Sequence, residues 1–93
     1  MLNHDNQELC WEVLSKYGIR NQRMMVIEEC SELQKTICKM YRKDFPSVES
    51  DDNFLEELVD VIVMCQQMIL ADGISMDVVN KLANKKLNRA LEG

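Results

Sequence analysis

Apolar residues recur at intervals of three and four along most of the chain, which is the spacing that places them on one face of an α-helix. The pattern predicts four helices: from residue 3 or 5 to 17, over 21–42, from 51 or 52 to 71, and over 76–91. Gly18 and the pair Asp72-Gly73 are typical helix ends, and Ser75 is a typical N-cap. The segment 44–52, which holds the only proline, is predicted to be a loop.

The third of these segments is apolar around nearly its whole circumference. A run of β-branched residues at 59, 61, 62 and 63 is also compatible with a strand, but the length of the segment favours a helix. A helix that is apolar all round is buried on more than one side. We therefore expect it to be central, with a second face at a subunit interface.

The chain has 93 residues, which predicts a single domain over 1–93 with an all-α fold, four-helix-bundle-like. A domain of this size buries only about 60–65% of its unfolded surface, so its own core is marginal. Oligomerisation is one remedy, and we expect a homodimer or a homotetramer to complete the fold.

Charge and cysteine content narrow the class of protein. The net charge is −5, which argues against general nucleic-acid binding, and no apolar run reaches the 18 or so residues of a membrane span. The four cysteines form no C-x-x-C pair, and no signal peptide precedes them, so reduced thiols in a cytoplasmic protein are expected. Acidic residues crowd the middle of the chain, whereas the last stretch is basic.

Two short acidic motifs lie within the apolar faces of the second and third helices: residues 28–32 read EECSE, and residues 56–60 read EELVD. Each contains two carboxylates three residues apart, Glu29 with Glu32 and Glu57 with Asp60. At about 100° per residue, the members of each pair lie about 60° apart on their helix. Glu29 falls inside the apolar stripe of its helix, and Glu57 inside that of the next.

These four carboxylates indicate a cation site. Burying a carboxylate costs several kcal/mol unless something positive meets it, and antiparallel packing through the two stripes brings all four together. Hard divalent cations prefer oxygen ligands, so Mg²⁺ is the expected occupant, with Mn²⁺ as a surrogate. A single E-x-x-E is more often a solvated helix face. A di-iron site needs Glu-x-x-His on two helices, and the one histidine, His4, lies in no such motif.

In these motifs the chain resembles the MazG-like, all-α nucleoside triphosphate pyrophosphohydrolase superfamily. That superfamily carries E-E-x-x-E on one helix and E-x-x-D on the next, and a later N-x-K-x-x-R-like element matches residues 84–89. The resemblance spans about residues 20–91. It implies Mg²⁺-dependent cleavage between the α- and β-phosphates of a nucleotide, with a monophosphate and pyrophosphate as products.

The resemblance also implies roles for individual residues. The metal ligands are Glu29, Glu32, Glu57 and Asp60, and the residues facing the phosphates or sugar are Asn84, Lys86 and Arg89. Because no histidine lies in these motifs, a carboxylate must be the base, and the candidates are Glu28 and then Glu32. Lys86 and Arg89 have an equally good interpretation as solvated charges near a helix C-terminus.

Base recognition has the weakest signal in the sequence. Trp11 is the aromatic residue we single out for stacking on a base, although an aromatic at helical spacing is more often part of a core. An alternative to the enzyme is a non-catalytic helical module, which binds a nucleotide or a protein and uses its acidic residues for a structural cation. The two hypotheses differ in whether the four carboxylates share one solvent-reachable site.

Overall fold

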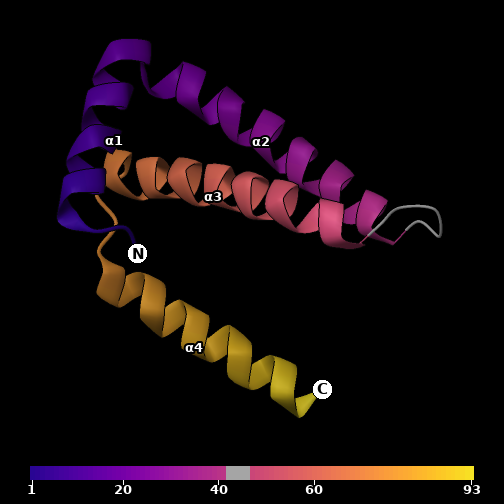
Figure 1. Ribbon diagram of the computed structural model, residues 1–93. Helices are drawn as coiled ribbons and strands as arrows, with labels where there is room; N and C mark the ends of the chain where they lie inside the picture. Colours follow the sequence, from indigo (N-terminus) through magenta and orange to yellow (C-terminus); the bar gives the residue numbers. More distant parts are fainter. Residues whose placement is uncertain (42–46) are drawn as a thin grey trace.

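The computed structural model describes residues 1–41 and 47–93, with the side chains of α3 described from residue 53 onward. Its helices are α1 (His4–Tyr17), α2 (Ile19–Met40), α3 (Ser47–Ala71) and α4 (Met76–Glu92) (Figure 1). The described residues contain no strand, so the prediction of an all-α fold is confirmed. The strand alternative for the third segment is wrong.

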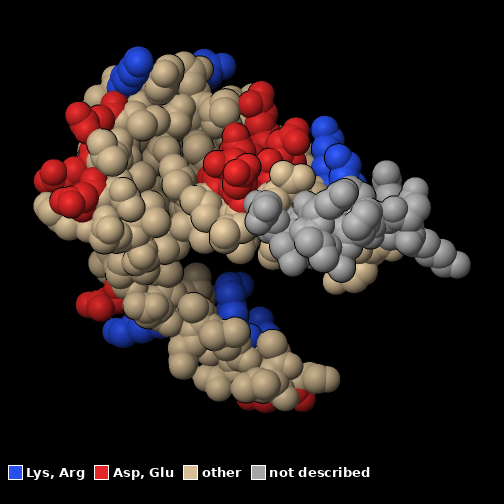
Figure 2. Space-filling view, in the orientation of Figure 1, with Lys and Arg blue, Asp and Glu red and all other residues tan. Residues whose placement is uncertain are grey.

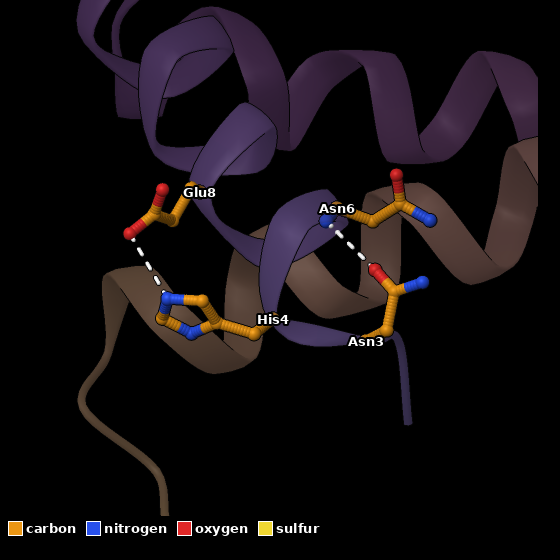
Figure 3. Close-up of polar contacts among 4 residues, drawn as sticks. All are labelled: Asn3, His4, Asn6 and Glu8. Carbon is orange, nitrogen blue, oxygen red and sulfur yellow. Dashed lines mark hydrogen bonds and ion pairs between the residues drawn. The ribbon is translucent and has the colours of Figure 1, made fainter.

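The first helix begins where the sequence places it. The side chain of Asn3 accepts a hydrogen bond from the backbone N–H of Asn6 at 2.9 Å, which satisfies one of the free N–H groups at the helix start (Figure 3). Next to the cap, His4 Nε2 lies 3.1 Å from a carboxylate oxygen of Glu8, which is one turn further along the helix. Both side chains are exposed. The histidine is therefore a surface residue.

A single glycine joins α1 to α2. Gly18 has φ of +87°, a conformation that side-chain-bearing residues rarely adopt, and its N–H donates to the carbonyl of Leu14 at 2.8 Å. The next helix then starts at Ile19, two residues before the predicted start, because one left-handed residue is enough to change the chain direction. It ends at Met40, so the predicted extension to Arg42 falls partly outside the described residues.

The start of α3 corrects the predicted loop over 44–52. Residues 47–52 are helical, and residues 44–46 lie outside the described part of the chain. The predicted caps at Asp51 and Asp52 are therefore wrong. Proline and serine are common both in loops and at the starts of helices, so their presence did not distinguish the two.

Helices α2 and α3 run antiparallel and form the main packing unit, and α1 crosses them at the end where α2 begins and α3 finishes (Figure 1). Among the side chains that the structure describes, few apolar ones are buried: Cys10 and Leu14 from α1, and Met64 from α3. Buried amides accompany them. Gln22 donates to Gln67 across the α2–α3 contact at 2.8 Å, which connects positions 45 residues apart.

The turn after α3 is a Schellman motif. Ile74 N–H donates to the carbonyl of Ile69 at 3.0 Å, Gly73 N–H donates to that of Leu70, and Gly73 has φ of +65°. Ser75 then caps α4 by accepting from the N–H of Val78 at 3.3 Å, as predicted.

The last helix leaves the packed unit. Among the described residues, no Cα of α4 lies within 8 Å of one in α1, α2 or α3, and Figure 1 shows α4 diverging from α3. From residue 80 to the end every side chain of α4 is exposed. The bundle within one chain therefore consists of α1–α3. None of the described helices is long and apolar enough to cross a membrane.

The methionines of the helices differ in burial. Met64 is buried, and Met25, Met40 and Met68 are half-buried. Met24 is 60% exposed, so it does not belong to the core. It points away from α3, because it lies on the opposite side of α2 from Gln22.

Candidate metal centre

Three carboxylates meet where α2 faces α3. Glu29 from α2 and both Glu57 and Asp60 from α3 each offer one oxygen, and these oxygens all lie within 4.8 Å of one another. We call this group the carboxylate triad. The acidic side chains form one of the largest red areas on the face shown in Figure 2, over the α2–α3 pair. The predicted convergence of two acidic motifs is therefore present for three of the four residues.

The helix register explains why these residues meet. Glu29 follows Gln22 by seven residues, and Asp60 precedes Gln67 by seven residues. Because seven residues make about two turns and α2 and α3 are antiparallel, the amide pair and the triad lie on the same contact face about 10 Å apart. The Gln22–Gln67 hydrogen bond thus fixes the register that brings the carboxylates opposite one another.

Two members of the triad, Glu29 and Glu57, have raised pKa values. Desolvation by burial raises the pKa of Glu29, and the charges of Asp60 and Glu57, a hydrogen bond with Asp60 and the charge of Glu28 raise it further. The pKa of Glu57 is also raised, first by desolvation and then by the charges of Asp60, Glu32 and Glu56. A bound cation reverses both causes, because it supplies opposite charge and replaces lost hydration.

One oxygen of the triad has no hydrogen-bond partner among the residues that the structure describes. Oε2 of Glu57 is buried and accepts no hydrogen bond from the described part of the chain. A buried acceptor without a partner costs free energy, more so when it carries charge. Within the described residues no Lys or Arg forms an ion pair with a triad member. This orphaned oxygen, in a donor set made only of carboxylates, fits a hard divalent cation.

The fourth predicted ligand lies at the edge of this group. Glu32 is exposed and its carboxylate is 3.5 Å from Nζ of Lys35, one turn along the same helix. It does not belong to the triad, although its charge reaches Glu57. Glu28 is also exposed and lies on the flank, where its charge acts on Glu29. Both candidate bases therefore lie next to the triad, on the solvent side.

The other predicted site residues are not next to the triad in a single chain. Asn84 and Arg89 line a shallow polar hollow of about 440 Å³ on α4, and Lys86 is exposed on the same helix. Because α4 does not pack against α2 or α3, these three residues stay predictions as phosphate or sugar contacts. Trp11 is 48% exposed on α1 and also stays a prediction.

The residues that the sequence interpretation missed are the buried amides. Gln22 and Gln67 are 6% and 2% exposed, far below what is usual for glutamine. The signal was available, because each lies seven residues from a carboxylate of the triad on the same helix face. A polar residue two turns from a buried acid, on the same helix face, is a candidate for holding that acid in position.

No family model, curated protein or solved structure matches the chain in comparisons with known proteins. The functional argument therefore depends on the residues themselves and on the motif resemblance.

Proposed function

We propose that the protein is a Mg²⁺-dependent nucleoside triphosphate pyrophosphohydrolase that cleaves a ribo- or deoxyribonucleotide between its α- and β-phosphates. The observation that carries this proposal is the carboxylate triad, with its orphaned Glu57 Oε2. Its acidic motifs resemble those of the MazG-like superfamily, in which the same positions bind the metal. Control of nucleotide pools or removal of unwanted nucleotides is the role that this activity would serve.

The donor set suits this chemistry. Carboxylates from two helices would hold the cation, and Mg²⁺ commonly combines one or two protein carboxylates with water and substrate phosphates. When bound, the ion supplies charge neutralisation of the triphosphate and a lower pKa for a coordinated water. Asp60 is the exposed member of the triad, so the side of the site that it borders is open to a polyanion.

Proton transfer is assigned to the flanking glutamates. A water oxygen attacks the α-phosphorus, the bond to the bridging oxygen breaks, and pyrophosphate leaves. Glu28 is the first candidate to accept the proton of that water, and Glu32 the second, because both are exposed beside the triad. A carboxylate oxygen of Glu32 also lies 3.5 Å from Nζ of Lys35.

The phosphate contacts would come from α4. Lys86 and Arg89 are cations that can stabilise the departing pyrophosphate, and Asn84 can donate to a phosphate or sugar oxygen. They can reach the triad only if α4 of the same chain or of another copy is placed over α2 and α3, because α4 is not packed there in the single chain.

One observation favours the alternative of a non-catalytic module. No triad residue lines any of four well-formed hollows on the described surface. A cation bound at an open surface can order two helices, or bridge to a ligand, without any hydrolysis. The enzyme would release a monophosphate and pyrophosphate from a nucleotide, whereas the non-catalytic module would release no product.

The deciding experiment is product analysis on a panel of ribo- and deoxyribonucleoside triphosphates, with Mg²⁺ and with EDTA. Release of monophosphate and pyrophosphate only with the metal is the expected result. Orthophosphate would mean that a different bond is cut. No turnover by the folded protein, with Mg²⁺ binding intact, would support the non-catalytic module.

A matched pair of variants tests the site. Glu57→Gln keeps the size of the side chain and removes a ligand charge, so turnover should fall at least about 100-fold, since changes to residues outside the ligand set already cost 10–100-fold. Glu12→Gln makes the same change at an exposed position of α1 and should leave turnover unchanged. Full activity of Glu57→Gln would contradict the assignment of the metal ligands.

A further inference from the structure

A hollow of about 480 Å³ lies beside the corner at which the chain turns from α1 into α2 (Figure 1). Its lining comes from the end of α1 and the start of α2: Val13, Tyr17, Asn21, Gln22, Met24 and Met25. Ligand sites in proteins have volumes of about 300–1,000 Å³, and they combine apolar walls with a few polar groups. The size and the lining of this hollow both fit such a site.

One stripe of α2 leads from this hollow to the carboxylate triad. Its members follow one another at intervals of four, three and four residues, which keeps them on one side of the helix: Asn21, Met25, Glu28 and Glu32. Along the helix axis, Met25 and Gln22 lie about 6 Å and about 10 Å from Glu29. A pentose separates the base of a nucleotide from its α-phosphate. With the phosphates at the triad, the base therefore falls at the hollow.

The walls of the hollow offer hydrogen-bond acceptors. Gln22 is only 6% exposed, and its Nε2 donates to Gln67 at 2.8 Å, which leaves Oε1 as the second polar atom of the amide. No donor in the described part of the chain bonds to this oxygen. Asn21 is oriented in the same way, because its Nδ2 donates to the carbonyl of Tyr17 at 2.8 Å. A buried acceptor without a partner costs free energy, so the hollow favours a ligand that brings N–H groups.

Tyr17 supplies an aromatic ring to the hollow. The residue is 51% exposed, and Nζ of Lys16 lies 5.2 Å from the centroid of the ring. The lysine covers only one of the two faces of the ring, and stacking on a planar ligand uses the other. Trp11, the aromatic residue singled out in the sequence, does not line this hollow.

We infer that this hollow holds the base of the nucleotide and selects bases with an exocyclic amino group: cytosine, adenine or guanine. An amino group has two N–H bonds, one for Oε1 of Gln22 and one for Oδ1 of Asn21. Uracil and thymine carry a carbonyl oxygen in place of the amino group of cytosine, and that oxygen would face two acceptors. The inference rests on the proposed function, which places the phosphates at the triad.

The first test is the binding of nucleosides, which carry no phosphate, to the full chain in EDTA. NMR spectra that correlate ¹H with ¹⁵N follow the side-chain amide signals of Asn21 and Gln22. Both signals should shift with cytidine and adenosine, at about 10- to 100-fold lower concentrations than with uridine and inosine, which carry oxygen in place of the amino group. Equal shifts with all four nucleosides would overturn the selectivity, and no shift with any of them would overturn the subsite.

A matched pair of variants tests the stacking. Tyr17→Leu removes the ring and keeps an apolar side chain, so the affinity for cytidine should fall at least about 5-fold. Tyr41→Leu makes the same change at a tyrosine that is 85% exposed, and it should leave the affinity unchanged. Loss of affinity in Trp11→Leu, with Tyr17→Leu unaffected, would overturn the assignment to this hollow. Circular dichroism shows whether each variant is folded.

Product analysis separates this inference from the proposed function. In the enzyme, kcat/KM should be about 10- to 100-fold higher for CTP than for UTP. Binding of cytidine in preference to uridine without hydrolysis of CTP would support the base subsite and contradict the enzyme. Hydrolysis of CTP and UTP with equal kcat/KM, together with no binding of nucleosides, would support the enzyme and overturn the base subsite.

Discussion

Gln22 and Gln67 form a buried side-chain hydrogen bond between α2 and α3, with Nε2 of the first 2.8 Å from Oε1 of the second. The bond lies two helical turns from the point where Glu29 meets Asp60. Gln67 also lies near Met64, whose sulfur is 3.8 Å from its Nε2. A buried polar contact between two helices can specify their register, because any other register leaves its polar groups without partners.

This amide pair gives a prediction about stability. Gln22→Leu leaves Gln67 buried without its partner, so the free energy of unfolding should fall by about 1–3 kcal/mol. The double variant Gln22→Leu/Gln67→Leu removes both polar groups and should recover much of that loss. Urea denaturation of the two single variants and the double variant measures the coupling. Strictly additive losses would show that the hydrogen bond contributes nothing specific.

The register of α2 against α3 that the amide pair supports should also affect the affinity for Mg²⁺. In the double leucine variant α2 and α3 lose the contact that places Glu29 opposite Asp60, so Mg²⁺ should bind more weakly even though stability is largely kept. Calorimetric titration with Mg²⁺ alone measures this. Unchanged affinity would mean that the acidic motifs find their register without the amides.

Mg²⁺ should stabilise the folded chain. A ligand that binds only the folded state at 100 times its Kd adds about 2.7 kcal/mol, which for a domain of this size is a rise of about 10–20 °C in Tm. The rise should be absent in Glu57→Gln and present in Glu12→Gln. Thermal melts with Mg²⁺ and with EDTA measure this rise in Tm. The same melts with Ca²⁺ in place of Mg²⁺ test whether the site selects the smaller ion.

Without a metal, the triad should make stability depend on pH. The pKa values of Glu29 and Glu57 are raised above 4.5 in the folded chain, so the folded state holds these protons more tightly than the unfolded state does. Their contribution to stability is complete below about pH 4.5 and is lost as the pH rises through the raised pKa values.

Thermal melts in EDTA between pH 4.5 and pH 7 test whether stability falls as the pH rises. At pH 7, Glu57→Gln should melt at a higher temperature than the wild type, because the substitution removes a desolvated charge among other carboxylates. The difference should shrink as the pH falls towards 4.5. A wild type that is more stable than Glu57→Gln at neutral pH in EDTA would indicate that the triad is neutralised by the protein itself.

The two glycines with positive φ should respond differently to substitution. Gly18 has φ of +87° with ψ of 151°, a region that is essentially restricted to glycine, so Gly18→Asn should cost about 1–3 kcal/mol. Gly73 has φ of +65° at the end of α3, where asparagine is often accepted, so Gly73→Asn should cost less. No described atom lies within 4 Å of the position that a Cβ would take at either glycine, so crowding is not the cause. Urea denaturation compares the two.

Local signals along the chain predicted most of the elements. Asn3 and Ser75 cap helices as their side chains suggested, because an N-cap bond involves residues only three apart. The start of α3 was missed because a proline and several polar residues occur both in loops and at helix starts. The acidic motifs were predicted to converge, and three of the four carboxylates do.

The exposure of Glu32 and the separation of α4 could not be predicted in this way. Glu32 lies at the edge of the α2 stripe, where a small rotation of the helix decides whether it points to α3 or to solvent. Asn84, Lys86 and Arg89 belong to a helix whose position depends on what packs against it. The sequence placed these residues on helix faces, and no local rule fixes how those faces are covered.

The sequence by itself determined the helices, their caps and the spacing of the acidic residues, because helix formation depends on contacts within about four residues. Tertiary structure alone decided the pairing of Gln22 with Gln67 and the exposure of α4. It also decided that Glu57 Oε2 has no hydrogen-bond partner among the described residues. These features arise from contacts between residues far apart in the chain, where small shifts in register exchange one neighbour for another. The carboxylate triad depends on both, since spacing sets the face and packing brings the faces together.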